Sequence, residues 1–241
     1  MSAAELVRPA DTGAYASLDL VYINGTEIVS RAIRAVQRPG WNRLPHSIRR
    51  RSRRGGYSHV AMVVRNDVLD AVPPGEAWVL ESTMSGRWGD GVRDVDGHGR
   101  FGVQLRRLPD LLEAYTGRLA AKGAAIGHAR WRGPPPTPAD RAVLSALWRN
   151  KLRGTRYNMS PLVLLASVCP QLRPARRLHA LLVPQDRFLF CSELVAWVLQ
   201  WLGRVAPDVV VDEVVPMDFV GWGEEGAAWL PYGPIVRLMV Q

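Results

Sequence analysis

The order of apolar and polar residues in the N-terminal half predicts several strands and one helix. Residues 18–23 are typical of a strand, and a single apolar stripe predicts a helix over 26–36. Residues 57–64 are apolar on both faces after His59, which is expected of a strand in the centre of a sheet. Residues 78–82 predict the strand that returns beside it in a hairpin.

The C-terminal half combines strands with clearly delimited helices. It predicts strands at 103–108, 117–121 and 235–240. Residues 109–115 predict a short helix, and a longer helix follows Thr137, with Pro138 as its first residue and Asp140 in its first turn.

A further helix begins where the apolar residues 188–190 end. Its buried face is predicted to contain Leu194, Val195, Val198, Leu199 and Leu202. Gly203 is placed to end it, and Cys191 falls in or just before its first turn. Unpaired N–H groups and the helix dipole favour a thiolate there, and the thiolate is the reactive form of cysteine. The alternative is an inert buried cysteine, because free cysteines are commonly part of the core.

A histidine and a carboxylate are predicted to face each other in the hairpin. Pairing that is symmetric about Asp70 sets Val60 against Leu80 and His59 directly against Glu81. Directly opposed residues lie on one face of a sheet, with Cβ atoms about 4.5–5.5 Å apart. Taken singly, His59 is equally compatible with a core histidine and Glu81 with a surface residue. The remaining histidines lie in less regular contexts: His46, His98, His128 and His179.

These three residues are the parts of a thiol hydrolase. Cys191 is expected to attack a carbonyl carbon, and His59 to hold it as a thiolate and then protonate the leaving group. Glu81 is expected to orient the imidazole and stabilise its charged form. The backbone N–H of Cys191 is a natural oxyanion donor because it lies at a helix N-terminus.

The order of several short motifs resembles the permuted papain-like proteins of the NlpC-type superfamily, in the branch that includes YiiX-like proteins. The motifs are Ser58-His59-Val60-Ala61, Leu80-Glu81-Ser82, Gly154-Thr155-Arg156-Tyr157-Asn158, Phe190-Cys191-Ser192-Glu193-Leu194-Val195 and Pro216-Met217-Asp218. The resemblance extends from about residue 18 to about residue 220. It implies an α+β domain with a circularly permuted papain-like fold, in which an antiparallel sheet packs against the helix that carries the cysteine.

The resemblance also implies roles for individual residues. It assigns Cys191 as nucleophile, His59 as base and Glu81 as the third polar residue. Tyr157 and Ser192 are expected to contact substrate, although Tyr157 is equally compatible with a packing role. Where the family often has Gly-Asp before its first strand, this chain has Leu18-Asp19, which we interpret as a minor change in a turn.

Composition limits the class of protein. At 241 residues the chain fits one domain, 1–241. Two cysteines are too few for a disulfide framework, the first residues lack the pattern of a signal peptide, and no apolar run is long enough to span a bilayer. We therefore expect a cytoplasmic protein without a transmembrane segment. No phosphate-binding loop or zinc-ligand spacing is present in the sequence, so no cofactor and no metal are expected.

The net charge of +9 comes almost wholly from arginine. The densest cluster comprises Arg49, Arg50, Arg51, Arg53 and Arg54. It predicts an exposed loop that is either simply solvated or makes weak contact with an anionic surface. A non-catalytic module that binds acidic surfaces through this loop is accordingly one alternative function.

The combined patterns predict a cysteine hydrolase that cleaves an amide bond, with a peptide or lipid-linked amide as substrate. A second alternative uses the same three residues in a thiol acyltransferase or lipid thioesterase. The acyltransferase passes an acyl group from a lipid through Cys191 to an amine, and the thioesterase passes it from a lipid thioester through Cys191 to water.

Overall fold

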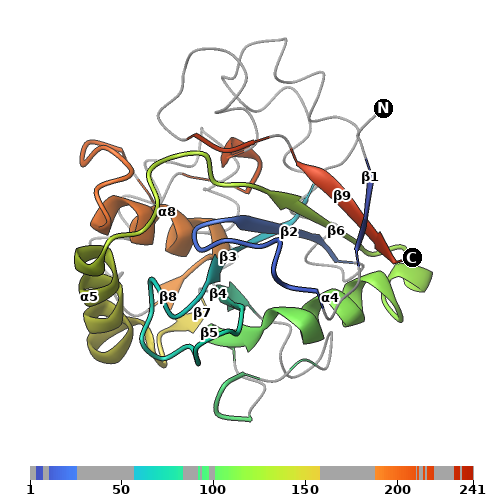
Figure 1. Ribbon diagram of the computed structural model, residues 1–241, viewed down its shortest axis with the longest axis horizontal. Helices are drawn as coiled ribbons and strands as arrows, with labels where there is room; N and C mark the ends of the chain where they lie inside the picture. Colours follow the sequence, from blue (N-terminus) through green and yellow to red (C-terminus); the bar gives the residue numbers. More distant parts are fainter. Residues whose placement is uncertain are drawn as a thin grey trace.

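A large sheet lies at the centre of the protein in the computed structural model, which describes residues 4–7, 11–25, 57–83, 92, 94–97, 101–157, 188–209, 211, 214, 216–219, 231–233 and 235–240 (Figure 1). The strands are β1 (Ala4–Val7), β2 (Leu20–Asn24), β3 (His59–Val64), β4 (Trp78–Thr83), β5 (Gly102–Arg107), β6 (Ala125–Ala129), β7 (Arg156–Tyr157), β8 (Phe188–Leu189) and β9 (Val236–Val240). The helices are α4 (Leu108–Thr116), α5 (Pro138–Leu147) and α8 (Cys191–Trp201). Shorter helical turns are η1 (Ala120–Lys122), η2 (Trp148–Leu152) and η6 (Pro216–Phe219).

Seven of the described strands form the large sheet in the order β1-β9-β6-β2-β3-β4-β5. Six of them, from β9 to β5, are antiparallel to their neighbours, and β1 pairs with β9 in parallel at the edge. Strands β7 and β8 form a separate parallel pair. The predicted α+β class is therefore confirmed.

Both faces of the sheet are covered by helices. One face packs against α8 and α5, through residues such as Val60, Met62 and Leu80. The other face packs against α4, through residues such as Ala61 and Val63 (Figure 1). A strand covered on both sides buries the side chains of both its faces, and this explains why β3 is apolar without alternation after His59. The sequence-based prediction that this strand is central is confirmed.

Local signals fix the ends of the predicted helices. The Thr137 side chain accepts a hydrogen bond from the backbone N–H of Asp140, and the Asp140 carboxylate accepts one from the backbone N–H of Thr137, which completes a capping box at the start of α5. Helix α8 begins at Cys191, as predicted. The chain leaves α8 through Gly203, whose φ of 65° is a left-handed conformation that glycine adopts at little cost.

The register of the central hairpin differs from the prediction. Strands β3 and β4 pair with Met62 opposite Leu80, so Val60 is not opposite Leu80 and His59 is not directly opposite Glu81. The predicted register is wrong by two residues, because the connection between the strands is not symmetric about Asp70. A shift of two keeps every side chain on its face, so His59 and Glu81 remain on the same side of the sheet.

Two further predictions are corrected around β6. Residues 117–121 are not a strand: the chain turns there and enters η1. The strand lies later, at Ala125–Ala129, between β2 and β9. It carries His128, which is buried in a regular strand rather than in an irregular segment.

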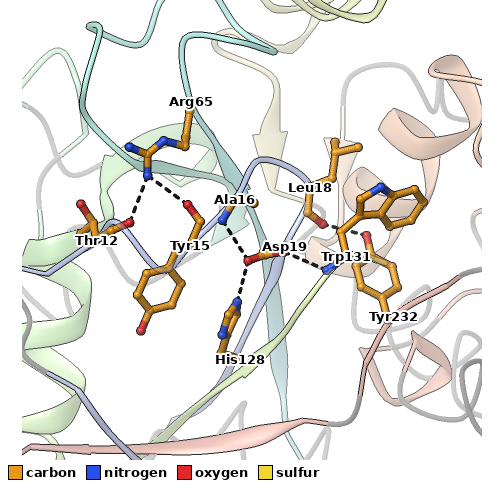
Figure 2. A network of polar contacts seen from close by, with 9 residues as sticks. All are labelled: Thr12, Tyr15, Ala16, Leu18, Asp19, Arg65, His128, Trp131 and Tyr232. Atoms are coloured by element: carbon orange, nitrogen blue, oxygen red, sulfur yellow. Dashed lines mark hydrogen bonds and ion pairs between the residues drawn. The ribbon is translucent and has the colours of Figure 1, made fainter. Parts of the chain in front are cut away.

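Residues Leu18 and Asp19 form the centre of a buried polar network at the start of β2 (Figure 2). Asp19 accepts hydrogen bonds from the backbone N–H groups of Ala16 (3.0 Å) and Trp131 (2.8 Å), and its Oδ2 lies 2.7 Å from Nε2 of His128. Leu18 has a φ of 73° and is fully buried. The interpretation of Leu18-Asp19 as a minor change is therefore wrong, because leucine here occupies a backbone conformation that favours glycine.

Several sequence-based predictions lie outside the described residues. They are the helix over 26–36, the arginine cluster Arg49, Arg50, Arg51, Arg53 and Arg54, the residue Cys169, and the histidines His46, His98 and His179. Within the part of the chain that the structure describes, no helix has the length and apolar character required to cross a membrane.

Candidate active site

Three elements of the fold bring Cys191, His59 and Glu81 together. Cys191 is the first residue of α8, His59 is the first residue of β3, and Glu81 lies within β4. Helix α8 packs against β3 and β4, so its N-terminus reaches the end of the sheet at which β3 begins. Cys191 and Glu81 are buried, while 15% of the His59 side chain remains exposed.

The start of α8 is held in place by its neighbours. The Ser82 hydroxyl on β4 donates a hydrogen bond to the carbonyl oxygen of Leu189 (2.6 Å), just before the helix. The Glu193 carboxylate accepts one from the backbone N–H of Phe190 (3.1 Å). This contact is only half of a capping box, because phenylalanine has no side-chain acceptor. These contacts fix the position of Cys191 relative to β4.

His59 connects the cysteine to the carboxylate. Its Nε2 lies 2.5 Å from Oε2 of Glu81, and its ring also hydrogen-bonds with the Cys191 sulfur. Because Nε2 is engaged with Glu81, Nδ1 is the nitrogen that remains for the sulfur. The adjacent Ser58 is tied to β2 through its backbone N–H, which donates to the carbonyl oxygen of Ile23 (3.0 Å). The imidazole is thus held between a sulfur and a carboxylate.

The surroundings of Cys191 favour the thiolate. Burial raises the pKa of the thiol, but the positive charge and hydrogen bond of His59 are the first of several interactions that lower it, and together they hold the pKa below its ordinary value of 9.0. Backbone hydrogen bonds from Val60 and Ser192 lower the pKa further. They come from two directions, since Val60 follows His59 on β3 and Ser192 follows Cys191 on α8.

The same interactions favour the imidazolium form of His59. Burial lowers the pKa of His59, but the negative charge and hydrogen bond of Cys191, followed by those of Glu81, raise it from 6.5 to about 10. Between the pKa of the cysteine and about pH 10, the two residues form a thiolate–imidazolium ion pair.

Glu81 is ionised although it is fully buried. Burial raises the pKa of its carboxyl, but the charge of Arg106 and the contacts with His59 lower it below the ordinary value of 4.5. Arg106 lies on β5 and forms an ion pair with Oε1 of Glu81 through Nε. Sequence reasoning missed this arginine because neither its position nor its neighbours form a motif. Val103 and Leu105 alternate with the polar Gln104 and Arg106, which is the ordinary pattern of a strand with one exposed face. The burial of Arg106 becomes evident only when β5 is known to be the neighbour of β4.

The two residues predicted to contact substrate lie close to Cys191. Tyr157 is buried, and its ring packs edge-on against Phe190 with centroids 5.6 Å apart. Burial, followed by the charges of Cys191 and Glu193, raises the pKa of Tyr157 above 10.0, so the phenol stays neutral. The Ser192 hydroxyl donates a hydrogen bond to the carbonyl oxygen of Val214 (2.7 Å). Contact of either residue with substrate remains a prediction.

Among the described residues, no group of three or more His, Cys, Asp or Glu side chains is placed to hold a metal ion. Comparison of the chain with protein-family models finds no model that matches, and comparison with curated proteins finds no match.

Proposed function

We propose that the protein is a cysteine hydrolase that cleaves an amide bond, with Cys191 as nucleophile, His59 as general base and acid, and Glu81 as the residue that orients His59. The observation that supports this proposal is that His59 contacts both Cys191 and Glu81. A buried cysteine with a structural role needs neither an imidazole at its sulfur nor a carboxylate behind that imidazole. The proposed substrate is a peptide amide or a lipid-linked amide.

In the first half of the reaction, the Cys191 thiolate attacks the amide carbonyl carbon. A C–S bond forms, and the carbonyl π electrons move to the oxygen. The backbone N–H of Cys191 is positioned at the helix N-terminus to stabilise that oxyanion. As the oxyanion collapses, the C–N bond breaks and the imidazolium of His59 gives its proton to the departing amine. The products of this half are a thioester on Cys191, a free amine and a neutral His59.

In the second half, neutral His59 accepts a proton from water as the water oxygen attacks the thioester carbonyl. The tetrahedral intermediate expels the Cys191 thiolate and releases a carboxylic acid. The proton that His59 has taken from water restores the imidazolium, so the starting ion pair is regenerated. Glu81 stabilises the charged imidazole at the beginning and end of the cycle.

The first experiment measures the rate of alkylation of Cys191 by iodoacetamide as a function of pH, read by mass spectrometry of the peptides. Cys169 in the same chain serves as an internal comparison. We expect Cys191 to react well below the unperturbed thiol pKa of about 8.5, and His59→Ala to lose this reactivity. An ordinary thiol profile for Cys191 in the wild type would contradict the proposal.

An acyltransferase with the same residues predicts identical alkylation, so a second measurement separates the two reactions. The protein is acylated at Cys191 with an activated thioester, and the acyl-enzyme is left in water with or without an added primary amine. A hydrolase releases free acid at a rate that the amine changes little. Preferential transfer to the amine would favour the acyltransferase.

A further inference from the structure

A buried arginine lies directly behind the three residues of the candidate active site. Arg106 is 1% exposed, and its Nε forms an ion pair with Oε1 of Glu81, which is itself fully buried. The other carboxylate oxygen, Oε2, is the atom that contacts His59. Each oxygen of Glu81 therefore has its own cationic partner, Arg106 on one side and His59 on the other.

The sheet positions this arginine. Strands β4 and β5 pair with Glu81 opposite Gln104 and Val79 opposite Arg106, so Arg106 lies diagonally across from Glu81 on the same face. Long side chains reach a diagonal neighbour in an antiparallel pair. The guanidinium also donates a hydrogen bond from Nη1 to the carbonyl oxygen of Val92 (3.4 Å). Its position is thus determined by the sheet and by a segment outside it.

The burial of Glu81 creates a need for a permanent positive charge. A carboxylate taken out of water without a partner becomes protonated, because burial disfavours the charged form. His59 alone does not keep Glu81 ionised under all conditions, because the charge of His59 itself depends on Cys191 and on pH. Arginine remains charged at every relevant pH, so it keeps Glu81 ionised whatever the state of His59.

A purely structural ion pair is the other interpretation. Buried ion pairs contribute little net stability, because the cost of removing two charges from water offsets their attraction. A fold has little to gain from burying Arg106 and Glu81 for stability alone. The contact of Glu81 with the imidazole of a cysteine–histidine pair indicates a different use of the charge.

We propose that Arg106 is a positioning residue of the candidate active site: its guanidinium holds Glu81 as a carboxylate with Oε2 directed at His59, and thereby supports the Cys191–His59 ion pair. This inference rests on the proposed function. Arg106 itself touches neither Cys191 nor substrate in the proposed mechanism; it acts through Glu81.

The test is the pH profile of Cys191 alkylation by iodoacetamide in the wild type, Arg106→Met, Arg106→Lys and a control, Arg107→Met. Arg107 is the next residue on β5, is half-exposed, and pairs with Glu76 and Asp110 at 3.6 Å. Arg106→Met is expected to move the midpoint upward by about half to one pH unit, equivalent to about three- to tenfold less thiolate at the acid end. Arg106→Lys keeps the positive charge, so its midpoint should lie close to that of the wild type. Arg107→Met should have the wild-type midpoint.

An unchanged midpoint in folded Arg106→Met would overturn the inference. The proposed function would remain intact, provided that His59→Ala still loses the reactivity of Cys191 at low pH. If the wild type itself shows an ordinary thiol profile, the proposed function and the inference both fail. Where circular dichroism shows Arg106→Met to be unfolded, the double variant Arg106→Met with Glu81→Gln decides, because it removes both buried charges. A profile equal to that of Glu81→Gln alone supports the inference, and a further upward shift contradicts it.

Discussion

The side chains of His59 and Glu81 meet across a diagonal of two neighbouring strands, with 2.5 Å between Nε2 and Oε2. Met62 is opposite Leu80 in this pair of strands, so His59 begins its strand two residues away from the position directly opposite Glu81. Diagonal neighbours lie about 7–8 Å apart, which only a long or aromatic side chain spans. The contact therefore depends on the length of the glutamate as well as on its charge.

Glu81→Asp is expected to lose most of the function of Glu81, although it keeps the negative charge. The shorter side chain does not reach His59 across the diagonal, so the imidazolium loses its partner. The midpoint of Cys191 alkylation should rise nearly as far as in Glu81→Gln, by about half to one pH unit. A matched control is Glu76→Asp in the same hairpin, where the carboxylate is only partly buried and pairs with Arg107, so the profile should not change. A wild-type midpoint in Glu81→Asp would show that the side-chain length is irrelevant.

The alkylation profile of the wild type is expected to have two steps. The first lies below the ordinary thiol value of 9.0, where Cys191 ionises beside the imidazolium. The second lies near pH 10, where His59 loses its proton and the remaining free thiolate becomes a stronger nucleophile. His59→Ala should reduce the profile to one step at or above the ordinary thiol pKa of 9.0, because burial then raises the pKa of Cys191 without the opposing charge of the imidazolium. Alkylation rates measured from pH 4 to 11 check this, and a single step in the wild type would argue against the ion pair.

Ser192→Ala is expected to destabilise the protein by about 1–3 kcal/mol, because it leaves the carbonyl oxygen of Val214 without its buried hydrogen bond. Urea unfolding gives the change in the free energy of unfolding. Thr116→Val provides a comparison, since it also removes a hydroxyl that donates to a carbonyl, that of Leu112, but at a half-buried position that water can reach. Equal losses at the two sites would contradict the structural role of the Ser192 hydroxyl.

At position 18 a glycine variant should be more stable than an alanine variant, which is the reverse of the usual order of stability. Both Leu18→Ala and Leu18→Gly remove a fully buried side chain, which costs about 2–5 kcal/mol. Only glycine relieves the left-handed backbone, whose φ is 73°, by about 1 kcal/mol. Leu18→Gly should therefore be more stable than Leu18→Ala in thermal unfolding. At Leu144, a buried residue inside α5, the same pair should show the ordinary order, with alanine more stable.

Much of the architecture could be predicted because its signals are local. The capping residues Thr137 and Asp140 lie three positions apart, and the apolar run of β3 is continuous along the chain. The sequence predicted that Cys191, His59 and Glu81 act together, because the type of each residue and its position on a helix or strand indicate its chemistry. The strand that carries His128 was not, since Gly127 and two alanines give β6 a weak strand pattern. Strand β6 is stabilised by its pairing with β2 and β9 and not by the strand propensity of its own residues.

By itself, the sequence determined which segments form the central strands and the cysteine helix, and that a cysteine begins one element and a histidine another. These properties follow from periodicity and end signals within a few residues, so they do not require knowledge of neighbours. The tertiary structure decided the register that joins His59 to Glu81 on a diagonal, the pairing that places Arg106 behind them, and the left-handed turn at Leu18. Each depends on contacts between residues far apart in the chain, which arise only when the whole core packs.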